Sequence, residues 1–142
     1  QQRTIELVNR ELQFSGINFM MDMEDIQNIS HDYHMYSVKD GYHVNFENIN
    51  LRVHIFALSD EKSRYYKKVV YIMTENEEHQ LFGFNMYTPI ETKAETLRKH
   101  GFRNKGKTDS RYFSKYGVNI RLDSPSHIII YVDNPDNYMG GW

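Results

Sequence analysis

The 142-residue chain contains no cysteine and no long hydrophobic run, and each absence excludes a class of protein. Without cysteine there is no disulfide framework, no thiolate nucleophile and no cysteine-based metal site. No apolar run approaches the roughly 20 residues that a membrane-spanning helix needs. The formal net charge is only −2, and 39% of the residues are hydrophobic. The composition therefore predicts an ordinary soluble protein that can bury one core.

The lack of cysteine also bears on the cellular compartment, because disulfides are rare in the cytosol. The chain begins at Gln1 and not at a methionine. We expect a cytoplasmic protein, and the alternative is a periplasmic or secreted protein whose leader has been removed.

What the chain does contain is a repeat of itself. Two pairs of segments match at separations of 67 and 69 residues: Phe14–Phe19 with Leu81–Met86, and Ile49–Val53 with Val118–Leu122. A third match, between residues 70–76 and 128–134, closes each unit. Self-similarity of this kind is typical of repeated structural units. The sequence predicts a single domain, residues 1–142, built of two repeat units at about 14–76 and 81–134.

Helical patterns occur in three places. Residues 4–12 have apolar side chains at helical spacing, with Thr4 as the N-cap. Residues 23–35 combine an acidic first turn with apolar positions on one face. Pro89 opens a third helix, and Gly101 ends it.

Strand patterns fill much of the rest of the chain. Alternating or apolar runs predict strands at 42–46, 49–57, 68–74, 111–116, 118–123 and 127–133. The predicted fold class is α+β. Two tandem units, each a helix followed by three strands, form one mostly antiparallel sheet with the helices packed on one face.

The second unit contains a sequence pattern that is similar to a known repeat. Tyr112 precedes the run Lys115–Asp123, in which a tyrosine-glycine turn leads into an alternating strand, and the apolar run Ile128–Tyr131 follows. With the order of elements, this resembles the tandem repeat of β-lactamase-inhibitor-protein-like folds and of the related SmpA/BamE-type outer-membrane-assembly lipoproteins. The resemblance covers residues 14–134. It implies a protein that inhibits or scaffolds other proteins, as some two-unit proteins of this size do when they neutralise toxins.

In such a sheet one side of each strand packs on the helices, and the other side is available to a partner. The predicted outward residues are Arg52, His54 and Phe56 on one strand, Asn119 and Arg121 at the matching places in the second unit, and Tyr71 and Tyr131 on the return strands. Interfaces favour tyrosine, phenylalanine and arginine because these side chains bury a large area. We predict a partner-binding face here; the alternative is a solvated sheet surface.

The loop 58–67 is an insertion that the second unit lacks. It holds Arg64, Tyr65 and Tyr66. A loop that breaks a repeat is a natural place for partner specificity, although a tolerated surface insertion has the same appearance.

Charge is distributed unevenly along the chain. Residues 1–50 carry three cations against eight acids, whereas residues 98–115 carry seven cations against Asp109. Phe102, Tyr112 and Phe113 interleave with the basic stretch, a composition also found on nucleic-acid-binding surfaces. The alternative function is therefore a nucleic-acid-binding protein or a metal-independent nuclease. Because the whole chain is slightly acidic, a solvated face or a complement to an acidic protein is the preferred interpretation.

The sequence contains few patterns that indicate a metal site or a catalytic site. His31 and His34 lie three residues apart in the predicted helix, but no third ligand is indicated and the HExxH pattern is missing. His54, His100 and His127 could serve a nuclease, as histidines in most proteins could. We predict no metal site, no cofactor and no catalytic residue.

These patterns together predict a protein-binding inhibitor. The leading hypothesis is an immunity protein that neutralises a toxin or enzyme by occluding its active site. The expected partner is another protein, with no membrane span and with nucleic acid disfavoured. A third hypothesis is an envelope assembly module.

Overall fold

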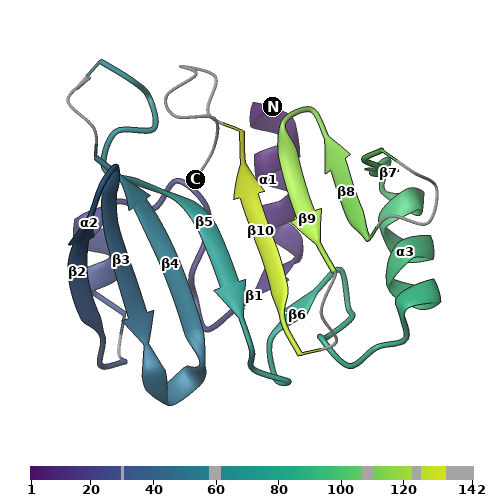
Figure 1. Cartoon of the computed structure of the whole chain (residues 1–142), viewed down its shortest axis with the longest axis horizontal. Coiled ribbons are helices and arrows are strands. Elements are labelled where there is room, and N and C mark those ends of the chain that lie inside the picture. Colours follow the sequence, from purple (N-terminus) through teal and green to yellow (C-terminus); the bar gives the residue numbers. More distant parts are fainter. Residues whose placement is uncertain (30, 58–61, 107–110, 123–125, 134–142) are drawn as a thin grey trace.

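The computed structural model describes residues 1–29, 31–57, 62–106, 111–122 and 126–133. Figure 1 shows the arrangement of the elements that these residues form. The helices are α1 (Gln2–Glu11), α2 (Met23–Gln27), the 3₁₀ helix η1 (Glu47–Ile49) and α3 (Ile90–Lys99). The strands are β1 (Leu12–Gln13), β2 (His34–Val38), β3 (Gly41–Phe46), β4 (Leu51–Phe56), β5 (Lys68–Thr74), β6 (Gln80–Leu81), β7 (Arg103–Asn104), β8 (Tyr112–Lys115), β9 (Val118–Arg121) and β10 (Ile128–Val132). None of the described helices is long and apolar enough to cross a bilayer.

Eight of the described strands form one antiparallel sheet in the order β2-β3-β4-β5-β10-β9-β8-β7. The first half of the chain supplies β2 to β5 and the second half supplies β7 to β10, so the return strands β5 and β10 meet at the centre (Figure 1). Strands β1 and β6 pair separately, with Leu12 opposite Leu81. The predicted α+β class and the mostly antiparallel sheet are confirmed.

The predicted layout of one helix and three strands in each unit is not what the structure has. Each half contributes four described strands to the sheet. The sequence predicts only three in each half, and β2 and β7 are not among them. Helix α1 precedes both halves and packs near β6.

The predicted helix 23–35 is wrong beyond its first turns. Asp22 caps α2 through a reciprocal pair of hydrogen bonds with Asp25, but the helix ends at Gln27. The residues that follow include aromatic and β-branched side chains, which favour strands, and His34–Val38 pairs with β3 around the turn at Asp40. Residues His31 and His34 therefore do not share a helix face. Thr4 is likewise not an N-cap, because α1 begins at Gln2.

The echo between the starts of the two halves corresponds to one local conformation. Ser15 and Gly16 have φ values of 58° and 88°, and Phe82 and Gly83 have φ values of 50° and 81°. The turns close with equivalent hydrogen bonds. The Ile17 amide donates to the Phe14 carbonyl over 3.1 Å, and the Phe84 amide donates to the Leu81 carbonyl over 3.0 Å. A two-residue turn of this type needs positive φ at both positions, which glycine adopts without strain. The same sequence pattern therefore produces the same tight turn twice.

The end of α3 follows the predicted glycine signal. Gly101 has a φ of 87°, and its amide donates to the Arg98 carbonyl over 3.0 Å. The Phe102 amide donates to the Leu97 carbonyl, also over 3.0 Å. This double return is a Schellman motif, and it places Phe102 in the core.

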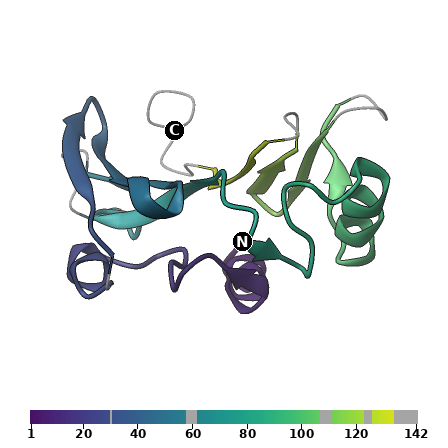
Figure 2. The ribbon, with the colours of Figure 1, turned by 90° about the horizontal axis from the view of Figure 1, so that it is seen from below.

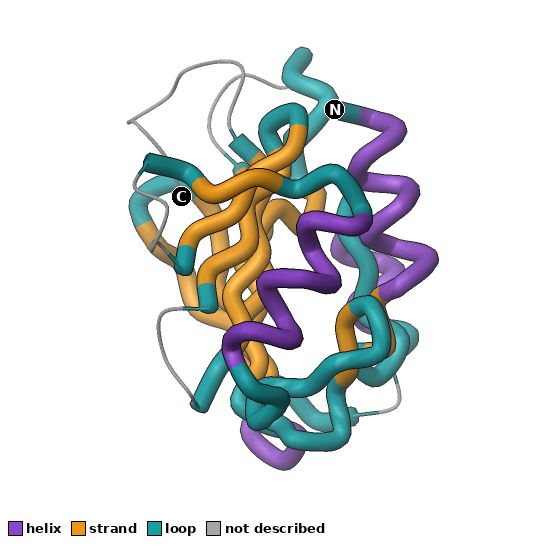
Figure 3. The backbone as a smooth tube through the Cα atoms, turned by 90° about the vertical axis from the view of Figure 1, so that its right-hand side faces the viewer, coloured by secondary structure: helices purple, strands orange, loops and turns teal. Residues whose placement is uncertain are grey.

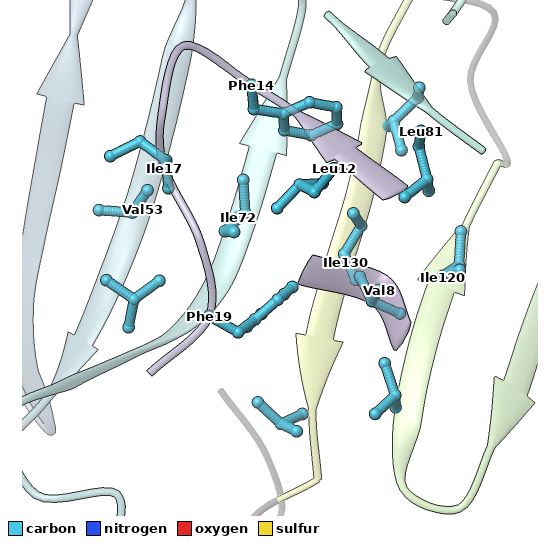
Figure 4. Close-up of a cluster of buried hydrophobic side chains, with 14 of the residues drawn as sticks. Val8, Leu12, Phe14, Ile17, Phe19, Val53, Ile72, Leu81, Ile120 and Ile130 are labelled. Atoms are coloured by element: carbon cyan, nitrogen blue, oxygen red, sulfur yellow. The ribbon is translucent and has the colours of Figure 1, made fainter. Parts of the chain in front are cut away.

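The three described α-helices lie on one side of the sheet (Figures 2 and 3). The core fills the space between them and the sheet. One buried row crosses the sheet through Val44, Val53, Ile72, Ile130, Ile120 and Phe113. Figure 4 shows Val8 of α1, with Leu12, Phe14, Ile17 and Phe19, laid over this row. Each fully buried side chain of this size contributes about 2 kcal/mol to folding.

Candidate functional site

The candidate site is the outer face of the sheet, opposite the helices. Because successive side chains of a strand point to opposite faces, the neighbours of the buried row form rows on this face. The first, the tyrosine row, runs across all eight strands in register: Tyr36, His43, His54, Tyr71, Tyr131, Asn119, Ser114 and Arg103.

A second row lies beside it, two residues along each strand. This arginine row consists of His34, Asn45, Arg52, Met73, Ile129, Arg121 and Tyr112. Side chains that sit opposite one another on neighbouring strands are close enough to contact. The two rows therefore form one continuous surface that includes both halves of the chain.

The structure brings together six of the residues predicted for a binding face. Within the two rows lie Arg52, His54, Tyr71, Asn119, Arg121 and Tyr131. Of these, Arg52, Tyr71, Arg121 and Tyr131 are partly exposed. Whether they contact a partner stays a prediction, but their shared location follows directly from the strand pairing.

Four aromatic or histidine residues of this face are not among those predicted from the sequence: His34, Tyr36, His43 and Tyr112. Tyr36 is 43% exposed and Tyr112 is 37% exposed, and both lie in the rows together with His43. The overlooked signal for Tyr36 and His43 is the strand-like run before the Asp40–Gly41 turn, since two such runs around a turn form a hairpin pattern. At Tyr112, the Arg121 guanidinium carbon lies 4.9 Å from the ring centroid, so the two side chains hold each other in place.

Two of the predicted outward residues are buried by polar contacts of the chain itself. Asn119 donates to Asp133 Oδ1 over 2.7 Å and accepts from Lys105 Nζ over 3.3 Å. His54 lies 3.2 Å from Asp40, between Nε2 and Oδ1. Both side chains therefore support the face from beneath and offer a partner little contact area.

Phe56 and Tyr65 are corrections to the predicted site, because both are fully buried. Phe56 ends β4 opposite Gly41, and it belongs to the core. The Tyr65 hydroxyl hydrogen-bonds the Gln1 side chain, and its ring lies 4.7 Å from the Arg64 guanidinium carbon. Tyr65 thus ties the loop before β5 to the start of α1, which is a structural role.

The other two loop residues remain accessible. Arg64 is exposed, although its Nη2 donates to Gln1 Oε1 over 2.6 Å. Tyr66 is half-buried, and the Lys67 ammonium lies 5.5 Å from its ring centroid. Positions 58–61 of the predicted loop lie outside the described residues.

At the end of the outer face formed by β2 to β5, four side chains form a chain of contacts. The Tyr36 hydroxyl lies 3.2 Å from His43 Nδ1, and the rings of His43 and His54 meet edge-on with centroids 5.0 Å apart. His54 then meets Asp40, and this histidine cluster borders a pocket of about 290 Å³. Arg52 lines the same pocket and is anchored by its Nε, which donates to Asn45 Oδ1 over 2.8 Å.

The surroundings keep both imidazoles neutral near pH 7. Burial lowers the pKa of His54, Asp40 opposes that shift, and His43 adds to it. Burial also lowers the pKa of His43, with a further lowering from Arg52 that Asp40 partly offsets. The fixed positive charge of the pocket therefore comes from Arg52 and from the exposed Lys39.

The cluster can donate and accept hydrogen bonds and can hold a polar or anionic group. Within the described residues no group of three or more histidine, aspartate or glutamate side chains is arranged to hold a metal ion.

The basic stretch 98–115 is largely committed to contacts within the chain. Arg98 donates to Asn104 over 2.9 Å, and Lys115 Nζ donates to the His100 carbonyl over 2.8 Å. Its two phenylalanines, Phe102 and Phe113, are buried and present no ring to a nucleotide base. Positions 107–110 lie outside the described residues.

No family model, curated protein or solved structure matches the chain. The resemblance to β-lactamase-inhibitor-protein-like repeats accordingly stays a prediction, and the geometry of the outer face is what bears on function.

Proposed function

We propose that the chain is a protein-binding inhibitor that uses the outer face of its sheet to cover the active site of a toxin or enzyme, as an immunity protein does. The observation that carries this is the pair of rows in register, of which the tyrosine row crosses all eight strands of the sheet and the arginine row crosses seven. Tyrosine, arginine, histidine and asparagine dominate these rows, and the three described α-helices lie on the opposite side of the sheet.

The size of the face supports this function. Seven inter-strand spacings of about 4.8 Å make it roughly 34 Å wide. Apart from the two-residue β7, these strands have four to seven residues and add roughly 15–20 Å in the other direction, which gives about 600 Å². A standard interface buries about 800 Å² on each partner, so the face and its bordering turns are large enough.

The rigidity of the face supports occlusion rather than wrapping. Tyr36, Arg52 and Arg121 are already held by neighbours, through His43, Asn45 and Tyr112. Side chains that are fixed before binding lose less conformational entropy on binding. The acidic first half and the basic 98–115 stretch would speed encounter with a partner of complementary charge. Binding, and not catalysis, is the proposed activity, and the cytoplasm is the proposed compartment.

We also propose that residues 14–76 and 81–134 are tandem copies of one unit. The repeated turns at Ser15 and Phe82 support this, and so does the strand order, in which the two halves meet at β5 and β10. Duplication would explain how a broad face arises from one short unit.

The test begins with capture of a partner from an extract of the source cells, its identification by mass spectrometry, and reconstitution from purified components. We expect the purified chain to inhibit the partner's activity at a one-to-one ratio. The double variant Tyr36→Ala/Tyr131→Ala should weaken binding by about 100-fold, since interface tyrosines each contribute 1–2 kcal/mol or more.

Tyr87→Ala is the matched control. Tyr87 is 61% exposed, but it precedes α3 and belongs to neither row. Equal affinity of the double variant and the control, or a partner that binds without losing activity, would contradict the proposed function.

A further inference from the structure

The pocket beside the histidine cluster has a polar and charged lining to which the proposed function assigns no role. It lies where the β2–β3 turn meets the outer face, and it measures about 290 Å³. Its lining consists of Val38, Lys39, Asp40, His43, Arg52, His54 and Tyr71. A space of this size can hold a small polar group and not a whole cofactor.

Arg52 is positioned as the principal donor of this pocket. Its Nε donates to Asn45 over 2.8 Å, which fixes the plane of the guanidinium. This is the hydrogen bond that Arg52 makes within the described part of the chain, and the terminal nitrogens are left to a ligand. A guanidinium held in this way can bind two oxygens of a carboxylate or phosphate at once.

The single carboxylate of the pocket is already engaged. Asp40 lies 3.2 Å from His54, so its charge is directed toward that ring. Lys39 and Arg52 are the two cations, and with neutral histidines the pocket carries an excess of one positive charge. The pocket is thus electrostatically suited to an anion, and it becomes more so when a histidine is protonated.

We propose that this pocket binds an oxyanion, a carboxylate or phosphate group, with Arg52 as the bidentate donor and His43 as a second donor. If the proposed function holds, the oxyanion is an acidic side chain of the inhibited protein, and the pocket is the polar anchor beside the tyrosines. The same pocket would bind free inorganic phosphate by the same chemistry.

Binding should be linked to protonation of His43. The groups that face His43 are Tyr36 from β2, Lys39 and Asp40 from the turn, Arg52 and His54 from β4, and Tyr71 from β5. Arg52 and burial oppose a proton on His43 in the free protein. An anion placed between Arg52 and His43 offsets both effects, so the affinity should rise as the pH falls below about 6.5.

The experiment is an NMR titration of the full chain, following the ring signals of His43 and His54 and the Nε signal of Arg52. One arm adds inorganic phosphate, and the other adds the capped peptide acetyl-Gly-Glu-Gly-amide. We expect saturable shifts with dissociation constants of about 1–10 mM, and tighter binding at lower pH. The source of the oxyanion is indicated by whichever probe binds more tightly.

Arg52→Gln should weaken binding at least tenfold, because one charge-assisted contact is worth about 1.5–3 kcal/mol. Arg103→Gln is the matched control, since Arg103 has the same charge and is exposed at the far end of the tyrosine row. His43→Gln should bind with little dependence on pH. Thermal melting of each variant verifies its fold.

Absence of saturation with both probes would overturn the oxyanion site, and so would equal binding by Arg52→Gln and Arg103→Gln. The fate of the proposed function is separate. If the unaltered chain binds a probe but Tyr36→Ala/Tyr131→Ala keeps full affinity for the partner, the oxyanion site stands and the proposed binding face is rejected. If the unaltered chain binds neither probe but the double variant loses affinity for the partner, the binding face stands and the oxyanion site is rejected.

Discussion

His79 shows how one buried side chain can connect distant parts of this fold. Its Nε2 lies 2.7 Å from the Ser15 hydroxyl and its Nδ1 lies 2.5 Å from the Thr74 hydroxyl, while its ring stacks on Phe14. The Thr74 hydroxyl already accepts from the Asn76 amide, so it can donate to Nδ1. A neutral ring then satisfies both hydroxyls, because Nε2–H donates to Ser15.

This environment predicts a pH-dependent stability. Burial, helped by the charge of His31, lowers the pKa of His79 to about 4 from an ordinary value near 6.5. Because the folded-state pKa is the lower one, the stabilisation is complete above about pH 6.5 and is lost as the pH falls toward 4. We expect the free energy of unfolding in urea to drop by about 2–3 kcal/mol from this residue between about pH 7 and pH 4.5.

His79→Gln should remove that part of the pH dependence while lowering stability at neutral pH. Carboxylates elsewhere titrate equally in both proteins, so the difference between the two curves isolates His79. Parallel curves for the variant and the unaltered chain would contradict this role.

Tyr65 is a second buried side chain that connects distant parts of the fold. Its ring is fully buried, and its hydroxyl bonds Gln1 and Arg64. Tyr65→Ala should cost about 3–5 kcal/mol of unfolding free energy, and Tyr65→Phe about 1 kcal/mol, because only the hydroxyl contacts are lost. Urea denaturation measures both, with Tyr66→Ala as the half-buried control. A Tyr65→Ala variant as stable as Tyr66→Ala would restore Tyr65 as a candidate surface anchor.

At the scale of single elements, the hairpin β2–β3 depends on a close approach at Gly41. A Cβ built on Gly41 would lie 1.9 Å from the Ile55 carbonyl oxygen of β4 and 2.9 Å from the Ala57 amide nitrogen. Both contacts are with backbone, which cannot move aside as a flexible side chain can. Gly41 is therefore required by the packing of β3 on β4.

Gly41→Ala should destabilise the protein by about 2–4 kcal/mol, through displaced strand pairing next to the histidine cluster. Gly83→Ala is the matched control: a Cβ there meets nothing within 4 Å, and the cost is that of a positive φ of 81°, about 1 kcal/mol. Chemical denaturation compares the two. A smaller loss for Gly41→Ala than for Gly83→Ala would be inconsistent with the tight packing described.

Elements with strong local signals were predictable, and those shaped by distant partners were not. Strand β5 has the bounds expected for it, and Gly101 ends α3, because apolar alternation and a left-handed glycine act locally. The predicted helix 23–35 includes the first two residues of β2, because they follow a helix start with an acidic first turn. Its pairing with β3 prevails over that start. Strand β7 has two residues and forms only because β8 pairs with it.

At the scale of the whole molecule, the candidate site depends on contacts that no local pattern specifies. Alternation predicts Arg52, Tyr71, Asn119 and Arg121 on outward rows of one sheet, but it does not specify which strands join the two halves. The pairing of Tyr71 with Tyr131 across β5 and β10 makes one face out of two. The burial of Phe56 and Tyr65 also escaped prediction, because both lie against segments distant in sequence.

The most direct measurement of the central claim is hydroxyl-radical footprinting of the chain with and without its reconstituted partner. Tyr36 and Tyr112 report on the two ends of the outer face, whereas Tyr87 and Tyr116, at 61% and 77% exposure, report on surfaces beyond it. We predict that the partner protects Tyr36 and Tyr112 from oxidation and leaves Tyr87 and Tyr116 unchanged. Protection of Tyr87 and Tyr116, with Tyr36 and Tyr112 oxidised as in the free protein, would contradict binding through the outer face.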